Sequence, residues 1–158
     1  MKKPELGQTI QILANVGVIA GIALLVYELN QNRDMMRTQI RNEISRSVMD
    51  LLVSGSTSEP LAAVMARANA GEDLSAEERF MFSNRAELSF RSWENVNYQY
   101  RQGMFDAAEY AAELATMSDV ISRNPAMIRY WCERQMFSVP FAQVIDTLPV
   151  MHGCDTGR

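Results

Sequence analysis

An all-α fold is predicted by three features of this 158-residue sequence. An uncharged, mostly apolar run stands near the N-terminus, apolar residues later recur at helical spacings of three and four, and capping signals separate those segments. No stretch shows the alternation of apolar and polar residues that is typical of a β-strand. We therefore expect a single N-terminal transmembrane helix that continues into a helical stalk, followed by a small helical bundle.

The composition narrows the possible functions. Hydrophobic residues make up 47% of the chain, which excludes low-complexity disorder. The net charge is −4 and the pI is near 5.0, so the chain lacks the basic field that attracts nucleic acid. Two cysteines do not make a disulfide-rich scaffold, and one histidine argues against most histidine metal sites. We expect no cofactor, no metal and no nucleic-acid partner.

The apolar run is the clearest single feature. Residues 6–27 carry no charge, and Glu5 and Glu28 bound them. As a helix this run spans about 33 Å, which matches a hydrocarbon core of roughly 30 Å. A cleaved signal peptide is an alternative, but its only small-x-small site, residues 21–23, precedes four large apolar residues. A buried core helix is a second alternative, although such runs are usually shorter. We expect a permanent anchor in the lipid bilayer.

Gly17 and Gly21 form a G-x-x-x-G pair within this run. Two glycines four residues apart leave a flat strip on which a second helix can pack closely. The pair therefore predicts a helix–helix contact in the membrane and a possible homo-oligomer. The alternative is a glycine-containing face that simply lies against lipid.

The charges that flank the span are nearly equal on its two sides, so they give little preference for either orientation in the membrane. Lys2 and Lys3 precede the span, and several arginines follow it, so the positive-inside rule barely discriminates. Cys132 and Cys154 show no sign of being a structural pair, which favours a reducing compartment. We expect a single-pass protein of the bacterial inner membrane with a cytoplasmic C-terminal domain.

The helix is expected to continue beyond the membrane as a stalk. One face of this helix stays apolar as far as Val53. The residues that follow, 54–60, are rich in turn formers. The apolar face consists of Met36, Ile40, Ile44, Val48 and Leu51. A neighbouring stripe of Arg33, Arg37 and Arg41 is interpreted either as a contact for acidic lipid headgroups or as a solvated face with local ion pairs.

Capping signals divide the remainder into short helices. Residues 60–70 form the first, closed by Gly71, and Ser75 with Glu78 forms a capping box. That box opens a long helix over 76–102, which Gly103 ends as a left-handed cap.

Three more helices complete the expected domain. Asp106 and Glu109 form a second capping box for a helix to about residue 122, and Asn124 with Pro125 opens a helix over 126–137. A last helix covers 138–148. The expected divisions are a short tail (1–5), a transmembrane helix (6–28), a stalk (29–53), a helical domain (54–148) and a flexible tail (149–158).

Three segments together resemble a group of small uncharacterised bacterial proteins. The segments are Val-Tyr-Glu-Leu-Asn-Gln-Asn at 26–32, the aromatic block at 90–100, and Tyr-Trp-Cys-Glu-Arg-Gln-Met-Phe-Ser at 130–138. The group has a single N-terminal transmembrane helix and an all-helical domain, and the likeness covers most of the chain. The resemblance implies this architecture and no particular chemistry.

Arginines and aromatic residues on two predicted helices make the one candidate binding site. If the helices at 76–102 and 126–137 pack together, their arginines could bind a carboxylate or phosphate between tryptophan walls. The candidate ligand-binding residues are Arg91, Trp93, Tyr98, Arg129, Trp131 and Arg134. The alternative is an ion-pair network between two helices, with Arg91 bonded to Glu94, Glu87 or Glu133, because an unpaired buried charge is costly.

Catalytic patterns are otherwise lacking. The sequence has no Walker loop, dinucleotide fingerprint or nucleophile elbow, and no serine or cysteine has a plausible histidine partner. His152 and Cys154 are two ligands in a terminal tail, which is weak support for a metal site. We expect no catalytic residue and lean against an enzyme. The sequence predicts a membrane-anchored, non-catalytic helical interaction or scaffold protein with an unknown protein partner. The alternative function is a membrane-anchored sensor or enzyme for a small anionic ligand.

Overall fold

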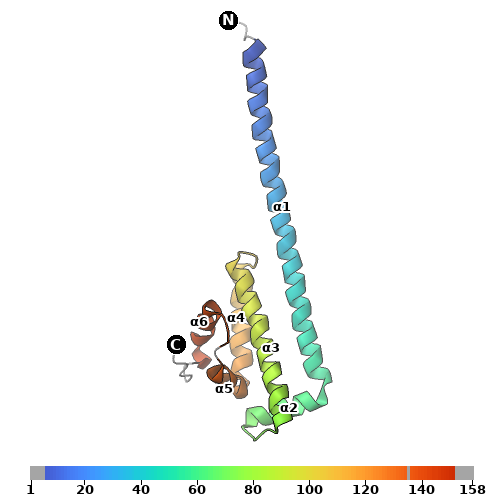
Figure 1. The fold of residues 1–158 in the computed structure, drawn as a ribbon, viewed down its shortest axis with the longest axis vertical. Helices are drawn as coiled ribbons and strands as arrows, with labels where there is room; N and C mark the ends of the chain where they lie inside the picture. The colour runs from blue at the N-terminus through green and yellow to red at the C-terminus, as the bar shows by residue number, and fades with distance from the viewer. Residues whose placement is uncertain (1–5, 135, 152–158) are drawn as a thin grey trace. The chain divides into compact units, whose positions relative to one another are not determined.

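The all-α prediction is confirmed by the computed structural model, which describes residues 6–134 and 136–151 (Figure 1). These residues contain no strand. The helices are α1 (Leu6–Thr57), α2 (Glu59–Ala70), α3 (Ala76–Arg101), α4 (Ala107–Ser122), α5 (Pro125–Glu133), α6 (Val139–Asp146) and the short 3₁₀ turn η1 (Pro149–Met151).

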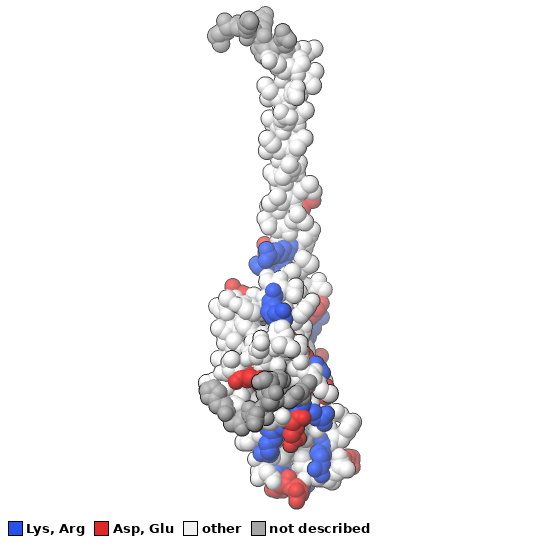
Figure 2. Space-filling model, turned by 60° about the vertical axis from the view of Figure 1, so that its left-hand side comes forward, with Lys and Arg blue, Asp and Glu red and all other residues white. Residues whose placement is uncertain are grey.

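The chain divides into two compact units, and the division falls within α1 between Gln39 and Ile40. The described part of the first unit is helix alone, and every side chain from Leu6 to Gln39 is exposed. Figure 2 shows its apolar segment as a continuous white surface free of charged side chains. Among the helices of the described residues, α1 is the one long and apolar enough to cross a membrane.

The second unit begins inside the segment that the sequence predicted as a stalk. Three residues of the predicted apolar face belong to the core, since Ile44 is buried and Ile40 and Val48 pack against it, whereas Met36 is exposed. The residues of α1 after Gln39 are therefore part of the helical unit.

The end of α1 differs from the prediction. The helix runs to Thr57, whereas the turn formers after Val53 suggested a linker. The hydroxyls of Ser54, Ser56 and Thr57 donate to backbone carbonyls three or four residues earlier, at 2.8–3.1 Å. These hydroxyls bond to backbone carbonyls of the same helix, so the polar run is accommodated within α1.

The predicted caps of α2 and α3 are confirmed. Gly71 follows α2 in the left-handed region with φ 76°, and its amide donates to the carbonyl of Ala68. Ser75 and Glu78 satisfy each other's backbone amides in a capping box. Gly103 adopts φ 70° after α3, a conformation that favours glycine.

The second predicted capping box is only half formed. The carboxylate of Asp106 accepts hydrogen bonds from the amides of Ala108 and Glu109, as expected of an N-cap. The carboxylate of Glu109 forms an ion pair with Arg41 of α1 at 2.7 Å. Glu109 therefore forms a tertiary contact with α1 instead of the local capping contact that the sequence predicted.

Helix α5 ends at Glu133, earlier than the predicted end at residue 137. The chain leaves the helix so that Phe137 can stack on Trp131, with ring centroids 4.9 Å apart. Trp131 is fully buried and also contacts Phe90 of α3 and Phe141 of α6, at centroid distances of 4.9 and 5.8 Å. The stabilisation from burying these rings outweighs that of the four further helical residues that the sequence predicted.

The side chain of Asn69 links α2 to the start of α5. Its side-chain oxygen accepts a hydrogen bond from the amide of Ala126 at 3.2 Å, and its nitrogen donates to the side chain of Asn124 at 2.8 Å. Asn124 itself forms no side-chain cap with α5 and donates instead to the carbonyl of Val120. The first turn of α5 is therefore capped by a residue distant in sequence.

Replacing Asn69 with alanine removes this cap and leaves the amide of Ala126 without its partner. We expect Asn69→Ala to lower the free energy of unfolding by about 1–2 kcal/mol, measured by denaturant unfolding of the full chain in detergent. Asn84→Ala is the matched control, because Asn84 is exposed on α3 and its side chain forms no hydrogen bond with the described residues. Equal stability of the two variants would contradict the cap.

Candidate functional site

Arg91 is occupied by contacts within the helical unit. It forms ion pairs with Glu94 at 2.8 Å and Glu87 at 3.6 Å, both on α3. Its guanidinium also donates to the carbonyl of Met136 at 3.0 Å and lies 4.6 Å from the ring centre of Phe137. Arg91 therefore has two of the acidic partners that the alternative to a ligand site named, but both lie on its own helix rather than on a second one.

Glu94 completes this contact with the loop between α5 and α6. Its carboxylate accepts a hydrogen bond from the amide of Ser138 at 2.7 Å. Burial alone raises the pKa of Glu94, but the hydrogen bonds from Ser138 and Arg91 outweigh it, so the pKa lies below its ordinary value. The hydrogen bond to Glu94 in turn raises the pKa of Arg91. Together the pair fastens the loop to α3.

The predicted aromatic walls do not face a common cavity with the arginines. Trp131 is fully buried, and its indole nitrogen donates to the carboxylate of Asp146 at 2.8 Å. Trp93 is buried with its ring edge-on to Phe90, at a centroid distance of 5.4 Å. Tyr98 is 53% exposed on α3. The tryptophans therefore belong to the core, as large aromatic residues generally do.

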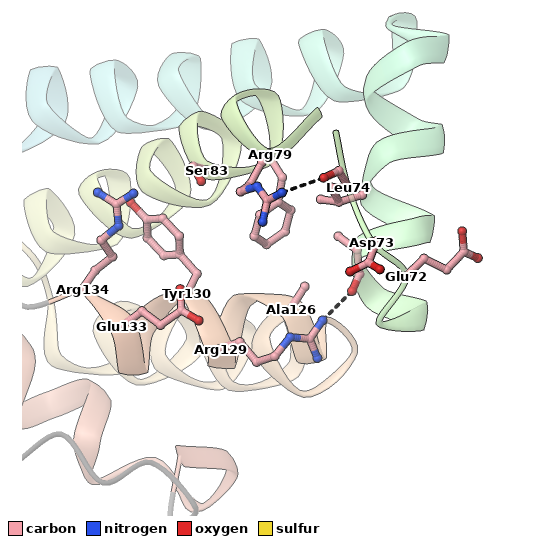
Figure 3. Close-up of a pocket in the computed structure, with 12 residues that line it drawn as sticks. Glu72, Asp73, Leu74, Arg79, Ser83, Ala126, Arg129, Tyr130, Glu133 and Arg134 are labelled. Carbon is pink, nitrogen blue, oxygen red and sulfur yellow. Dashed lines mark hydrogen bonds between the residues drawn. The ribbon is translucent and has the colours of Figure 1, made fainter. Parts of the chain in front are cut away.

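Arg129 and Arg134, in contrast, line one cavity of about 250 Å³. The cavity lies between α3, α5 and the turn that joins α2 to α3, and we call it the α3–α5 cavity (Figure 3). Its charged and polar lining residues are Glu72, Asp73, Arg79, Ser83, Arg129, Tyr130, Glu133 and Arg134. Arg91 is not among the residues that line it.

Two guanidinium groups in the α3–α5 cavity are held by the backbone. Arg129 donates to the carbonyl of Ala68 near the end of α2, and Arg79 donates to the carbonyl of Leu74 at 2.8 Å (Figure 3). Arg134 lies over the ring of Tyr130, 5.5 Å from its centre. Tyr130 also donates to the carboxylate of Glu87 at 3.3 Å, and burial raises its pKa.

Arg79, Ser83 and Asp73 were missed by the sequence prediction. One signal was available for Arg79, which lies near the start of α3, four residues after the N-cap Ser75. A cation near the N-terminal end of a helix is electrostatically disfavoured, and such a residue often has another partner. No sequence signal indicated that the turn between α2 and α3 lies opposite α5.

Metal ligation finds no support within the described residues, which contain no group of three metal-binding side chains. His152 and Cys154 lie outside the described residues. Cys132 is disulfide-bonded. The expectation of a reducing compartment rested on unpaired cysteines, and this bond removes that ground.

Gly17 and Gly21 lie in the first unit on an open helix surface. A Cβ atom added at either position would meet nothing within 4 Å. The strip that the sequence predicted is therefore accessible to a second helix or to lipid.

Comparison with protein-family models, curated proteins and solved structures finds no match to this chain.

The pKa of Glu94 predicts a dependence of stability on pH. Because the folded pKa is lower than the ordinary value of 4.5, the ionised carboxylate stabilises the fold above that value, and this contribution is lost as the pH falls through the folded pKa. We expect Glu94→Gln to cost about 1–2 kcal/mol of unfolding free energy at neutral pH. The difference from the wild type should shrink in urea titrations at progressively lower pH.

The control for this measurement is Glu77→Gln, an exposed carboxylate of α3 with no bonded partner among the described residues. It should change the unfolding free energy by no more than about 0.5 kcal/mol. A deficit for Glu94→Gln that stays constant as the pH falls would show that its charge does not stabilise the loop.

Proposed function

We propose that this chain is a membrane-anchored, non-catalytic helical protein that acts through interactions with other proteins. The observation that carries the proposal is the uncharged helical segment of α1, whose side chains are all exposed. An apolar surface of that extent on a helix without helical partners is costly in water, and a bilayer is the medium that matches its length.

The helical unit supports the non-catalytic part of the proposal. One of its polar arrangements, Arg91 with Glu87 and Glu94, fastens a loop to α3. The candidate arginines therefore divide between a structural contact and the α3–α5 cavity. A sensor or enzyme that uses Arg91, Arg129 and Arg134 together is not favoured by these positions. The net charge of −5 from residue 54 onward also argues against a nucleic-acid partner.

Self-association through Gly17 and Gly21 remains a prediction. Support comes from the open surface around both glycines, which would let a second copy of α1 approach closely. A homo-oligomer formed in this way would bring two helical units to one place on the membrane and so present a repeated surface to a partner.

We further infer that the helical unit faces the oxidising side of the membrane, opposite to the cytoplasmic placement that the sequence suggested. The support is the disulfide at Cys132, because disulfides persist outside the reducing cytosol. In a bacterial inner membrane this side is the periplasm.

Charges placed within the proposed span should release the protein from the membrane. An arginine at the centre of a span costs roughly 2.5–3.5 kcal/mol. We expect Ile19→Arg combined with Ile22→Arg to move the protein out of the carbonate-washed membrane fraction. Met49→Arg combined with Leu52→Arg is the control, because both residues are exposed on the same helix beyond the span.

The mass of the wild-type chain completes this test. A permanent anchor retains residues 6–27 in the membrane-bound protein, whereas a cleaved signal peptide removes most of them. Retention of the doubly substituted protein in washed membranes, or a mature chain that lacks this segment, would refute the anchor.

The inferred orientation predicts the activity of C-terminal reporter fusions. Alkaline phosphatase fused after the last residue should be active, and a reporter that works only in the cytosol should be silent. In the same cells Cys132 should react with iodoacetamide only after reduction. An inactive phosphatase, together with an active cytosolic reporter, would restore the cytoplasmic placement.

A further inference from the structure

We propose that the α3–α5 cavity binds a small zwitterion of the amino-acid type, with the ligand's carboxylate on the arginines and its ammonium on the acids. The site lies within the helical unit, and its binding chemistry does not depend on the membrane anchor or on self-association. The inference begins from the charged groups that line the cavity (Figure 3).

The arginines of the α3–α5 cavity lack the carboxylate partners that several other arginines of the helical unit have. Arg67, Arg91 and Arg123 each form an ion pair with a carboxylate at the surface. Arg79, Arg129 and Arg134 form none with the described residues. Three guanidinium groups without a carboxylate partner therefore line one small cavity.

The backbone limits the movement of two of these groups. The bonds of Arg129 to the carbonyl of Ala68 and of Arg79 to that of Leu74 restrain each guanidinium but are not ion pairs with a carboxylate. A guanidinium has five N–H donors, so each retains donors for a carboxylate. Restrained groups lose less conformational entropy when a ligand binds.

The carboxylates that line the cavity restrict the class of ligand that can bind. Glu72 is already paired with Arg67, which lies outside the cavity lining, at 3.0 Å. Asp73 and Glu133 line the cavity and form no ion pair with the described residues. These two carboxylates repel a simple dianion and attract an ammonium group. A lining that presents free groups of both signs therefore favours a ligand that carries both.

Size and shape restrict the ligand further. Pockets for drug-sized ligands measure roughly 300–1,000 Å³, and the α3–α5 cavity, at about 250 Å³, is smaller. Phe82, Ala126 and the ring of Tyr130 supply apolar contact between the charged groups. In Figure 3 Arg134 lies at one end beside Tyr130, and Asp73 with Arg129 lies at the other. A free amino acid has the charges and the size for this arrangement.

Thermal unfolding of the full chain in detergent micelles tests the proposal. The probes are the common L-amino acids, with succinate and 1,4-diaminobutane as small ions of a single sign, all at about 10 mM. We expect at least one amino acid to raise the Tm by about 2–4 °C. Succinate and the diamine should each raise it by less than about 1 °C.

Titration calorimetry with the best amino acid then assigns the contacts. Arg79→Gln and Asp73→Asn should each weaken binding about tenfold, since each removes one charge-assisted contact. Arg123→Gln is the matched control, because this exposed arginine pairs with Asp119 on α4 away from the cavity, and it should bind as the wild type does. The Tm of each variant without ligand shows that it is folded.

Three results would overturn the proposal. One is that no amino acid raises the Tm, and another is that succinate raises it as much as the best amino acid. The third is unchanged affinity in both Arg79→Gln and Asp73→Asn while their unliganded Tm values match that of the wild type. Each of these results leaves the proposed membrane anchoring untouched, because that proposal is tested by fractionation.

Discussion

The stacking of Trp131 between α3 and the last helices organises the helical unit. Its indole is fully buried and contacts the rings of Phe90, Phe137 and Phe141, and Phe90 also contacts Phe137. Phe137 reaches this position only because α5 stops at Glu133 and the chain turns back. The loop that makes this turn is fastened to α3 through Met136 and Ser138. The packing of one aromatic side chain therefore sets where α5 ends and where α6 begins.

Two groups of arginines in the helical unit differ in what holds their guanidinium groups. Arg91 lies between two acids of its own helix, and its charge is compensated within the fold. Such a pair stabilises the protein but has little left to offer a ligand. Arg79 and Arg129 are bonded to backbone carbonyls, which restrain them without neutralising them. An arginine paired with a carboxylate therefore serves the fold, whereas an arginine bonded to a backbone carbonyl can still present its charge to a ligand.

The two units of the chain meet different physical demands. The helical unit buries aromatic and aliphatic side chains against one another, so it is suited to water on its outer surface. Residues 6–39, the described part of the first unit, bury no side chain, although residues 6–27 carry no charge. Our proposal of a membrane anchor resolves this contrast, since lipid is the solvent in which such a helix is stable. The disulfide at Cys132 is our reason for proposing that the helical unit lies on the oxidising side of the membrane.

Local sequence was sufficient for the helical class, the apolar segment and most helix starts, because periodicity and caps act over a few residues. Gly71 and the capping box at Ser75 illustrate this directly. Tertiary structure decided where α5 ends, what caps it, and which arginines share a cavity. Asn69 and Ala126 are 57 residues apart in the chain, and no local pattern relates them. The same holds for Arg79 and Arg129, whose roles depend on which backbone carbonyl folding brings within hydrogen-bonding distance.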